Sequence, residues 1–294
     1  MTRGRLRAEA VPSRVAPVSL DALRLPRLGK AYDLSSGWWP GMPLATGHPP
    51  FQVLTYRTPA GERNQKDLAF LDDNRVNFGF ISELLMCTVH TGTHIDALAH
   101  VTCGPDSCWH GGHSAATELG DFGPLSKDAS ELPPMIRRGV MLDIPACLGV
   151  PQLAAHQPVG RTDLQAACAR QGVDIGAGDV VLLRTGTMRL WPDPVHLAAC
   201  AGTGLSLDGA EWLAELEVEA VGADNVALEV NPSGIPGNPQ PVHRFLLQER
   251  GIPILEWVNQ EDLARDGVGE FLFVCLPLPI TGATGSLVRP LAIV

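Results

Sequence analysis

The chain has 294 residues, of which 45% are hydrophobic and 18% charged, a composition typical of one large globular domain or two small ones. Its formal net charge is −10, so we expect neither nucleic acid nor an anionic membrane as a partner. A small anionic substrate stays compatible with that charge, because a bound metal ion dominates its local field. The seven cysteines are scattered and no apolar run reaches the ~18 residues that cross a bilayer. Without a signal-peptide-like apolar core near the N-terminus, these features predict a cytoplasmic protein with reduced thiols.

The N-terminal residues 1–30 carry seven basic side chains and predict a flexible leader. No convincing linker follows, so residues 31–294 are expected to form one domain. A loop rich in glycine and proline comes next and contains two adjacent tryptophans. They either anchor the loop on the core or present one ring to an active site as a flat wall. Trp39 is the better candidate for that wall, because the following Pro40 restricts its backbone.

A weakly alternating segment, residues 51–56, indicates a strand, and the polar stretch 61–75 indicates a surface loop or hairpin. Phe78 faces either a substrate pocket or the core, and core packing is the default for such a residue. Residues 83–89 are apolar and partly β-branched, which predicts a short buried strand.

Three histidines and an aspartate follow within eleven residues: His90, His94, Asp96 and His100. Imidazole nitrogen and carboxylate oxygen form a ligand set suited to zinc, manganese or iron. Gly92 argues against one continuous helix, so we expect a strand, a tight turn, and a helix that starts near Ile95. That arrangement would let all four side chains converge on one point. The alternative is a set of unrelated polar residues on a loop.

The rest of the chain alternates strands with helices, which predicts an α/β fold. A loop rich in glycine, cysteine and histidine follows the motif, and its His110 is a candidate substrate contact or a surface residue. The segments that follow are expected to be strands at 139–144, 178–186 and 220–224 and helices at 162–171 and 206–216.

The sequence HTGTHIDALAH resembles the H-x-G-T-H-x-D-x-P-x-H signature of the "putative cyclase" family, with Leu98 in place of the proline. That family includes bacterial kynurenine formamidase, isatin hydrolase and a metal-dependent dienelactone hydrolase, and relatives in polyketide ring closure. The resemblance covers nearly all of residues 31–294. It implies a single-domain swivelling β/α/β-type fold, assembled as a homodimer or homotetramer. It also implies that His100 is the nonligating, catalytic histidine.

A second segment resembles the family's H-x-x-L-L … G-I-x-x-x-E pattern, and it implies that His243 and Glu256 complete one or two metal positions. His243 would head a helix that stops near Gly251, and Glu256 would end the strand after it. Trp257 stands where the family usually has asparagine, which leaves the identity of the substrate open.

These observations predict a hydrolase with a zinc or manganese cofactor that opens or cleaves an amide, imide or lactone carbonyl with metal-activated water. An arylformamide, isatin or a dienelactone would be a suitable small-molecule substrate. His100 would serve as general base, or would instead hold Asp96 in place. A metal-dependent cyclase or dehydratase acting on a polyketide-like intermediate is the alternative enzyme. A metal-stabilised binding protein is the alternative without catalysis.

Overall fold

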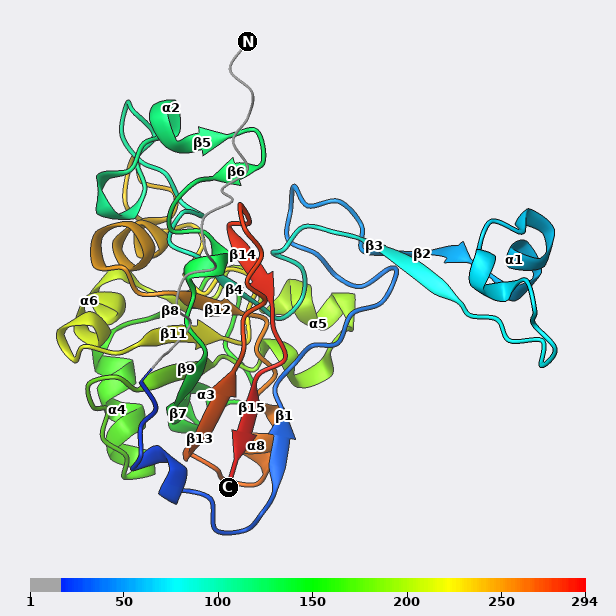
Figure 1. Ribbon diagram of the computed structural model, residues 1–294. Helices are drawn as coiled ribbons and strands as arrows, with labels where there is room; N and C mark the ends of the chain where they lie inside the picture. Colours follow the sequence, from blue (N-terminus) through cyan, green and yellow to red (C-terminus); the bar gives the residue numbers. More distant parts are fainter. Residues whose placement is uncertain (1–16) are drawn as a thin grey trace.

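The computed structural model describes residues 17–294, and Figure 1 shows a body built on one large sheet from which a long hairpin projects. The strands of this part of the chain are β1 (Ala31–Asp33), β2 (Gln52–Arg57), β3 (Ser82–Met86), β4 (His94–Asp96), β5 (Leu119–Gly120), β6 (Gly123–Pro124), β7 (Met135–Asp143), β8 (Pro158–Val159), β9 (Val180–Arg184), β10 (Gly204–Leu205), β11 (Ala220–Ala223), β12 (Ile254–Glu256), β13 (Glu270–Cys275), β14 (Gly285–Leu287) and β15 (Leu291–Ile293). The α-helices are α1 (Pro59–Gln65), α2 (Ala115–Glu118), α3 (Ile144–Leu148), α4 (Arg161–Gln171), α5 (Pro194–Ala199), α6 (Leu207–Glu215), α7 (Pro241–His243) and α8 (Glu261–Arg265). Short 3₁₀ helices are η1 (Ala22–Arg24), η2 (Ala69–Leu71), η3 (His110–Gly112), η4 (Ala129–Glu131) and η5 (Thr187–Leu190), and η6 (Arg244–Arg250) is a π-helix.

Nine of the described strands form the large sheet, in the order β1-β15-β13-β7-β9-β11-β12-β4-β14. Its centre, from β7 to β12, is parallel, whereas β4 is antiparallel to both of its neighbours. All five residues of β9 are buried, because apolar clusters cover both faces of the sheet. The fold is therefore α/β, as the alternation of predicted elements indicates.

The predicted helices in the second half of the chain are confirmed as α4 and α6, and the strand that follows is confirmed as β11. Helix α4 begins after Gly160, whose backbone N–H donates to the Asp163 carboxylate over 2.9 Å. It ends at Gly172, which has a φ of +66°. Leu164 and Ala167 lie on its buried face, one helical turn apart.

One prediction for the first third of the chain is wrong, and another is wrong in part. Residues 83–89 do not form a buried strand, because β3 pairs only with β2 among the described strands and Leu85 is 68% exposed. The stretch 61–75, predicted as a surface loop or hairpin, does lie between the paired strands β2 and β3, but its first residues belong to helix α1. Thr58 caps this helix by accepting the Gly61 N–H over 3.1 Å.

Residues 1–16 of the predicted leader lie outside the described residues. Residues 17–30 contain η1, whose Ala22 is buried against the sheet. Lys30 forms an ion pair with Asp266. None of the helices that the structure describes is long and apolar enough to span a membrane.

Candidate metal centre

Strand β4 carries two of the predicted ligands on one face of the sheet. Successive strand residues point to opposite faces, so His94 and Asp96 share a face while Ile95 enters the core and is completely buried. The prediction of a helix from Ile95 is therefore wrong. A strand with a polar–apolar–polar sequence places His94 and Asp96 on one face instead. In the register of the neighbouring β12, Glu256 lies opposite His94 and so reaches the same face.

A tight turn precedes β4 and needs glycine at its centre. Gly92 has a φ of +58°, and a Cβ there would lie 2.8 Å from the Ser36 hydroxyl and 2.9 Å from the Trp38 ring nitrogen. That nitrogen donates to the carbonyl of Thr91 over 2.7 Å. The loop that contains Trp38 therefore holds the turn in place, and the turn brings His90 close to Asp96.

The contacts of His90 fix the position of its ring. His90 Nδ1 lies 2.7 Å from Asp96 Oδ1, and Nε2 lies 2.9 Å from the Thr284 hydroxyl. The ring of His100 stacks on His90 with 3.9 Å between the centroids. His100 is thus held beside Asp96 by ring packing.

Hydrogen bonds to the other ring nitrogen aim His94 and His243 at the same point. His94 Nδ1 donates to the Gly92 carbonyl over 2.7 Å, which leaves Nε2 3.4 Å from both Asp96 Oδ1 and Glu256 Oε2. His243 Nδ1 pairs with Glu229, and its Nε2 lies 3.1 Å from Glu256 Oε1. Such bonds set the tautomer that presents Nε2 as a ligand.

Two groups of three side chains could each hold a metal ion, because the ligand atoms within a group lie within 4.8 Å of one another. Asp96 belongs to both groups. One group is His90, Asp96 and His100, and the other is His94, Asp96 and Glu256. Asp96 Oδ2 is buried and has no hydrogen-bond partner among the described residues. A buried carboxylate oxygen without a partner is costly unless a cation or a water satisfies it. The nitrogen and oxygen donors present fit a zinc or manganese ion.

The pKa values of the buried side chains also indicate that the centre favours bound positive charge. Burial alone would lower the pKa of His94 and of His243, but the adjacent carboxylates raise these pKa values to about 9 and about 10. Burial also opposes ionisation of Asp96, yet the surrounding histidines hold its pKa well below the usual value. The carboxylates therefore attract positive charge, which protons or a metal ion can supply. Burial lowers the pKa of His100 to about 4, so its imidazole is neutral at pH 7.

Of the three predicted substrate contacts, Trp39 belongs to a cluster next to the centre, whereas Phe78 and His110 do not. The Trp39 ring packs edge-on against Trp191, which in turn lies 4.8 Å from the Trp257 ring next to Glu256. Phe78 is 55% exposed near the end of the projecting hairpin, and His110 bonds to the Gln248 carbonyl. In a single copy of the described chain, therefore, an aromatic cluster that includes Trp39 adjoins the centre, while Phe78 and His110 contact other parts.

Three contributors to the centre carry no motif that would reveal them in the sequence: Glu229, Thr284 and Trp191. Glu229 is buried and accepts the backbone N–H of His243 over 3.0 Å, in addition to its contact with the ring. Its one sequence signal is its position shortly after β11, at the end of a parallel strand where sites collect in open α/β sheets.

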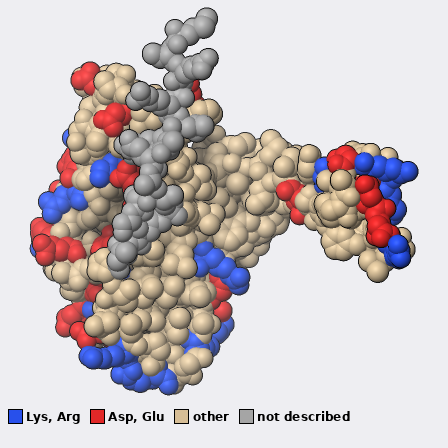
Figure 2. All heavy atoms as spheres, viewed as in Figure 1, with Lys and Arg blue, Asp and Glu red and all other residues tan. Residues whose placement is uncertain are grey.

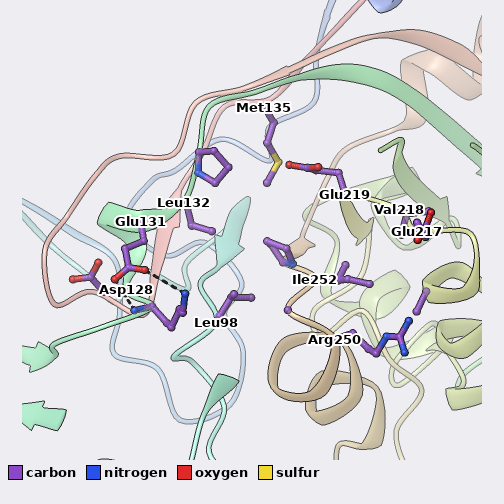
Figure 3. Close-up of a pocket in the computed structure, with 15 residues that line it drawn as sticks. Leu98, Asp128, Glu131, Leu132, Met135, Glu217, Val218, Glu219, Arg250 and Ile252 are labelled. Carbon is purple, nitrogen blue, oxygen red and sulfur yellow. Dashed lines mark hydrogen bonds and ion pairs between the residues drawn. The ribbon is translucent and has the colours of Figure 1, made fainter. Parts of the chain in front are cut away.

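A separate cavity of about 450 Å³ lies near the starts of β11 and β12, and Figure 3 shows Leu98, Glu219 and Ile252 around it. None of the metal-centre side chains lines it. Leu98, which replaces the proline of the family signature, therefore points toward this cavity, and the replacement leaves the ligands unchanged.

The chain matches the model of the family described as "Putative cyclase" over residues 32–230. It is 26% identical to cyclase-like protein 2 of Oryza sativa subsp. japonica over 212 residues, which are 71% of this chain and 63% of the rice protein. It is 25% identical to cyclase-like protein 1 of Arabidopsis thaliana, over 89% of this chain and 84% of that protein.

Solved structures are similar over most of their length. A crystal structure described as a novel cyclase has a TM-score of 0.78 at 27% identity, with 94% of this chain and 92% of that chain covered. Isatin hydrolase A of Labrenzia aggregata has a TM-score of 0.65 at 18% identity, with 90% and 93% covered, which is a likeness of fold. With the family model matched over most of the chain and the motif histidines gathered around Asp96, the chain belongs to the cyclase family.

Proposed function

We propose that this protein is a metal-dependent hydrolase that opens or cleaves an amide, imide or lactone carbonyl in a small flat substrate. The observation that carries the proposal is the buried Asp96 Oδ2, which has no hydrogen-bond partner in the described chain, at the meeting point of two ligand groups. A divalent ion bound there would lower the pKa of a coordinated water toward 7 and polarise the carbonyl.

The side chains of the centre divide into holding and proton-transferring roles. His90, His94, Asp96, His243 and Glu256 are the candidate ligands, and Glu229 and Thr284 orient the imidazoles. We assign His100 as the general base, because its ring stacks on His90 beside Asp96. Its backbone is also held in place, since its N–H donates to the Ala97 carbonyl. The protonated imidazole then returns the proton to the leaving nitrogen or oxygen. His100 also falls in one ligand group, so ligation is the competing role.

The aromatic cluster of Trp39, Trp191 and Trp257 supports a flat substrate. The rings pack edge-on or tilted and form a rigid apolar wall, and its Trp257 directly follows the candidate ligand Glu256 in the chain. An arylformamide, isatin or an unsaturated lactone would fit such a wall. The structural likeness to isatin hydrolases supports the same substrate class.

The test begins with protein purified without added metal. Its metal content is measured, and hydrolysis of an arylformamide, isatin and an unsaturated lactone is followed before and after chelation. We expect bound zinc or manganese and turnover that chelation abolishes. Absence of metal even after reconstitution would overturn the proposal.

The role of His100 is tested with His100→Ala, with His113→Ala as the matched control because His113 pairs with Glu118 outside the centre. Lost turnover with retained metal supports the base, whereas lost metal supports ligation.

Ring closure or dehydration of a polyketide-like intermediate is the second candidate. It is favoured by the likeness to a structure described as a novel cyclase, which has a higher TM-score than the isatin hydrolases. Bound metal without hydrolysis of any of the three substrates would support it.

A further inference from the structure

The loop that follows His100 holds two cysteines directly opposite one another. The Cys103 N–H donates to the Cys108 carbonyl and the Cys108 N–H donates to the Cys103 carbonyl, each over 2.9 Å. They therefore form an antiparallel bridge whose two side chains lie on the same face. The Ser107 N–H donates to the Gly104 carbonyl over 3.1 Å, which closes a tight turn between them. We call residues 103–108 the cysteine turn.

The spacing of this pair fits a disulfide. Residues that exchange both backbone hydrogen bonds have Cα atoms about 5.5 Å apart, and disulfides span Cα separations of roughly 4.4 to 6.8 Å. The Cβ atoms of such a pair are roughly 4.5 to 5.5 Å apart, against about 3.8 Å in a relaxed disulfide. A shift of about 1 Å in the turn would therefore let the bond form, and a bond made with such a shift is readily reduced.

Metal binding is the other chemistry that two adjacent thiols offer, and the nearby histidines do not support it. His110 Nδ1 donates to the Gln248 carbonyl over 2.9 Å, and His113 Nδ1 lies 2.7 Å from the Glu118 carboxylate. Among the residues that the structure describes, the groups that could hold a metal ion contain no cysteine. Cysteine-based zinc sites need four protein ligands, so an isolated pair favours the disulfide.

Both thiols are free and half-buried, so a small oxidant can reach them. The formal net charge of −10 opposes an anionic oxidant such as glutathione disulfide, whereas hydrogen peroxide is uncharged. The cysteine turn adjoins α2, because the Ala115 N–H donates to the Ser107 carbonyl over 3.2 Å. Figure 2 shows basic side chains gathered at the end of the body opposite α2 and at the tip of the projecting hairpin. These positions favour the uncharged oxidant.

We propose that hydrogen peroxide converts Cys103 and Cys108 into a reversible disulfide that locks the cysteine turn. The thiolate of one cysteine attacks the peroxide, whose O–O bond breaks, so that a sulfenic acid forms and one water leaves. The other thiol attacks this sulfur, the S–S bond forms, and the sulfenic oxygen leaves as a second water with the thiol proton. Two thiols are oxidised while one peroxide is reduced to two waters. A small thiol reverses the step by exchange and becomes a disulfide itself.

The lock would act on a segment that joins two parts of the metal centre. Cys103 follows shortly after His100, and the Cys108 carbonyl accepts the side-chain N–H of Gln248 over 2.8 Å. Gln248 belongs to η6, which begins directly after His243. The disulfide would keep the segment after His100 docked on η6 even when the two backbone hydrogen bonds of the turn open.

Thiol counting on the purified full-length chain is the first test. The chain has seven cysteines, and alkylation after unfolding should modify two fewer once the folded protein has been treated with an equimolar amount of peroxide. Peptide mass spectrometry should place the new bond between Cys103 and Cys108, and glutathione should restore all of the thiols. An unchanged count, a disulfide between other cysteines, or a loss of thiols to sulfinic acid would each overturn the proposal.

Substitution tests the assignment of the pair. Cys103→Ser and Cys108→Ser should each abolish the loss of two thiols. Cys87→Ser is the matched control, because Cys87 is also half-buried and is the nearest other cysteine in the chain, and its variant should still lose two thiols. Peptide mapping of the unsubstituted chain does not depend on how well these variants fold.

Hydrogen exchange tests the lock itself. The amides of Cys103 and Cys108 are expected to exchange more slowly in the oxidised protein than in the reduced protein, because the disulfide opposes opening of the turn. Equal exchange in the two forms would overturn the lock. Because none of these measurements uses a substrate, they stand apart from the hydrolase assignment.

Discussion

Strand β4 of the metal centre and strand β3 of the projecting hairpin are close neighbours in the chain and have opposite surroundings. Strand β4 has three residues, all buried between β12 and β14, whereas all but the first of the five residues of β3 are exposed. The apolar run of residues 84–86 in β3 nevertheless predicts burial. An apolar strand pattern therefore does not by itself show that the rest of the same chain covers the strand.

The largest expected effect in the buried metal centre is at Asp96, because both ligand groups share this residue. Asp96→Asn keeps the volume but removes a charge, and we expect turnover to fall by about 1000-fold or more, with loss of bound metal. Metal analysis and steady-state kinetics measure both effects. Normal metal content in this variant would contradict a centre organised on Asp96.

A core substitution between the two ligands comes next. Ile95→Ala removes a completely buried side chain that packs in the apolar cluster on the opposite face of β4. We expect a loss of about 3 kcal/mol in the free energy of unfolding, measured by urea denaturation of the metal-free protein. Leu84→Ala is the matched comparison from the projecting β2–β3 hairpin, where Leu84 is 49% exposed, and an equal loss there would contradict the contrast.

Glu229→Gln tests the support of the buried centre without changing any candidate ligand. Glu229 pairs with His243 Nδ1, so its carboxylate raises the basicity of that imidazole and fixes its orientation. Metal affinity is expected to fall about 10- to 100-fold, measured by competition with a chelating dye. Unchanged affinity would show that His243 needs no support or does not bind metal.

The smallest expected effect concerns Asp224, a buried carboxylate near the ends of the parallel strands. Burial raises its pKa from 3.8 to about 6, despite the N–H and hydroxyl bonds that it accepts from Thr185. Between those values the folded state holds a proton that the unfolded state has released, so the stabilisation is complete below pH 3.8 and is lost as the pH rises through 6.

Unfolding of the unsubstituted chain and of Asp224→Asn, compared between about pH 4.5 and 6.5, should therefore shift by about 2 kcal/mol in favour of the variant. A constant difference would mean that the donors from Thr185 and Gly186 keep the carboxylate ionised throughout.

The sequence predicts much of the body and most of the centre. Helices α4 and α6 and strands β9 and β11 have strong local signals, namely glycine boundaries, a periodic apolar face and a continuous apolar run. The motif histidines and Asp96 are recognisable by spacing alone, whereas His243 and Glu256 depend on the family resemblance.

The remaining features could not be read locally because distant residues determine them. Whether His94 to Asp96 form a helix or a strand depends on β12 and β14, and both are more than 150 residues away in the chain. Glu229 gains its role only when His243 lies beside it. The exposure of β3 depends on the body not folding back over it.

The position of β4 between β12 and β14 also bears on how the protein is made. Residues 94–96 leave the ribosome long before β14, the strand that completes their pairing and that begins at Gly285. The candidate ligands cannot all converge until Glu256 on β12 has also been made. Strand β4 therefore lacks its native partners until β12 and β14 have been made, and we expect its insertion to follow assembly of the parallel sheet.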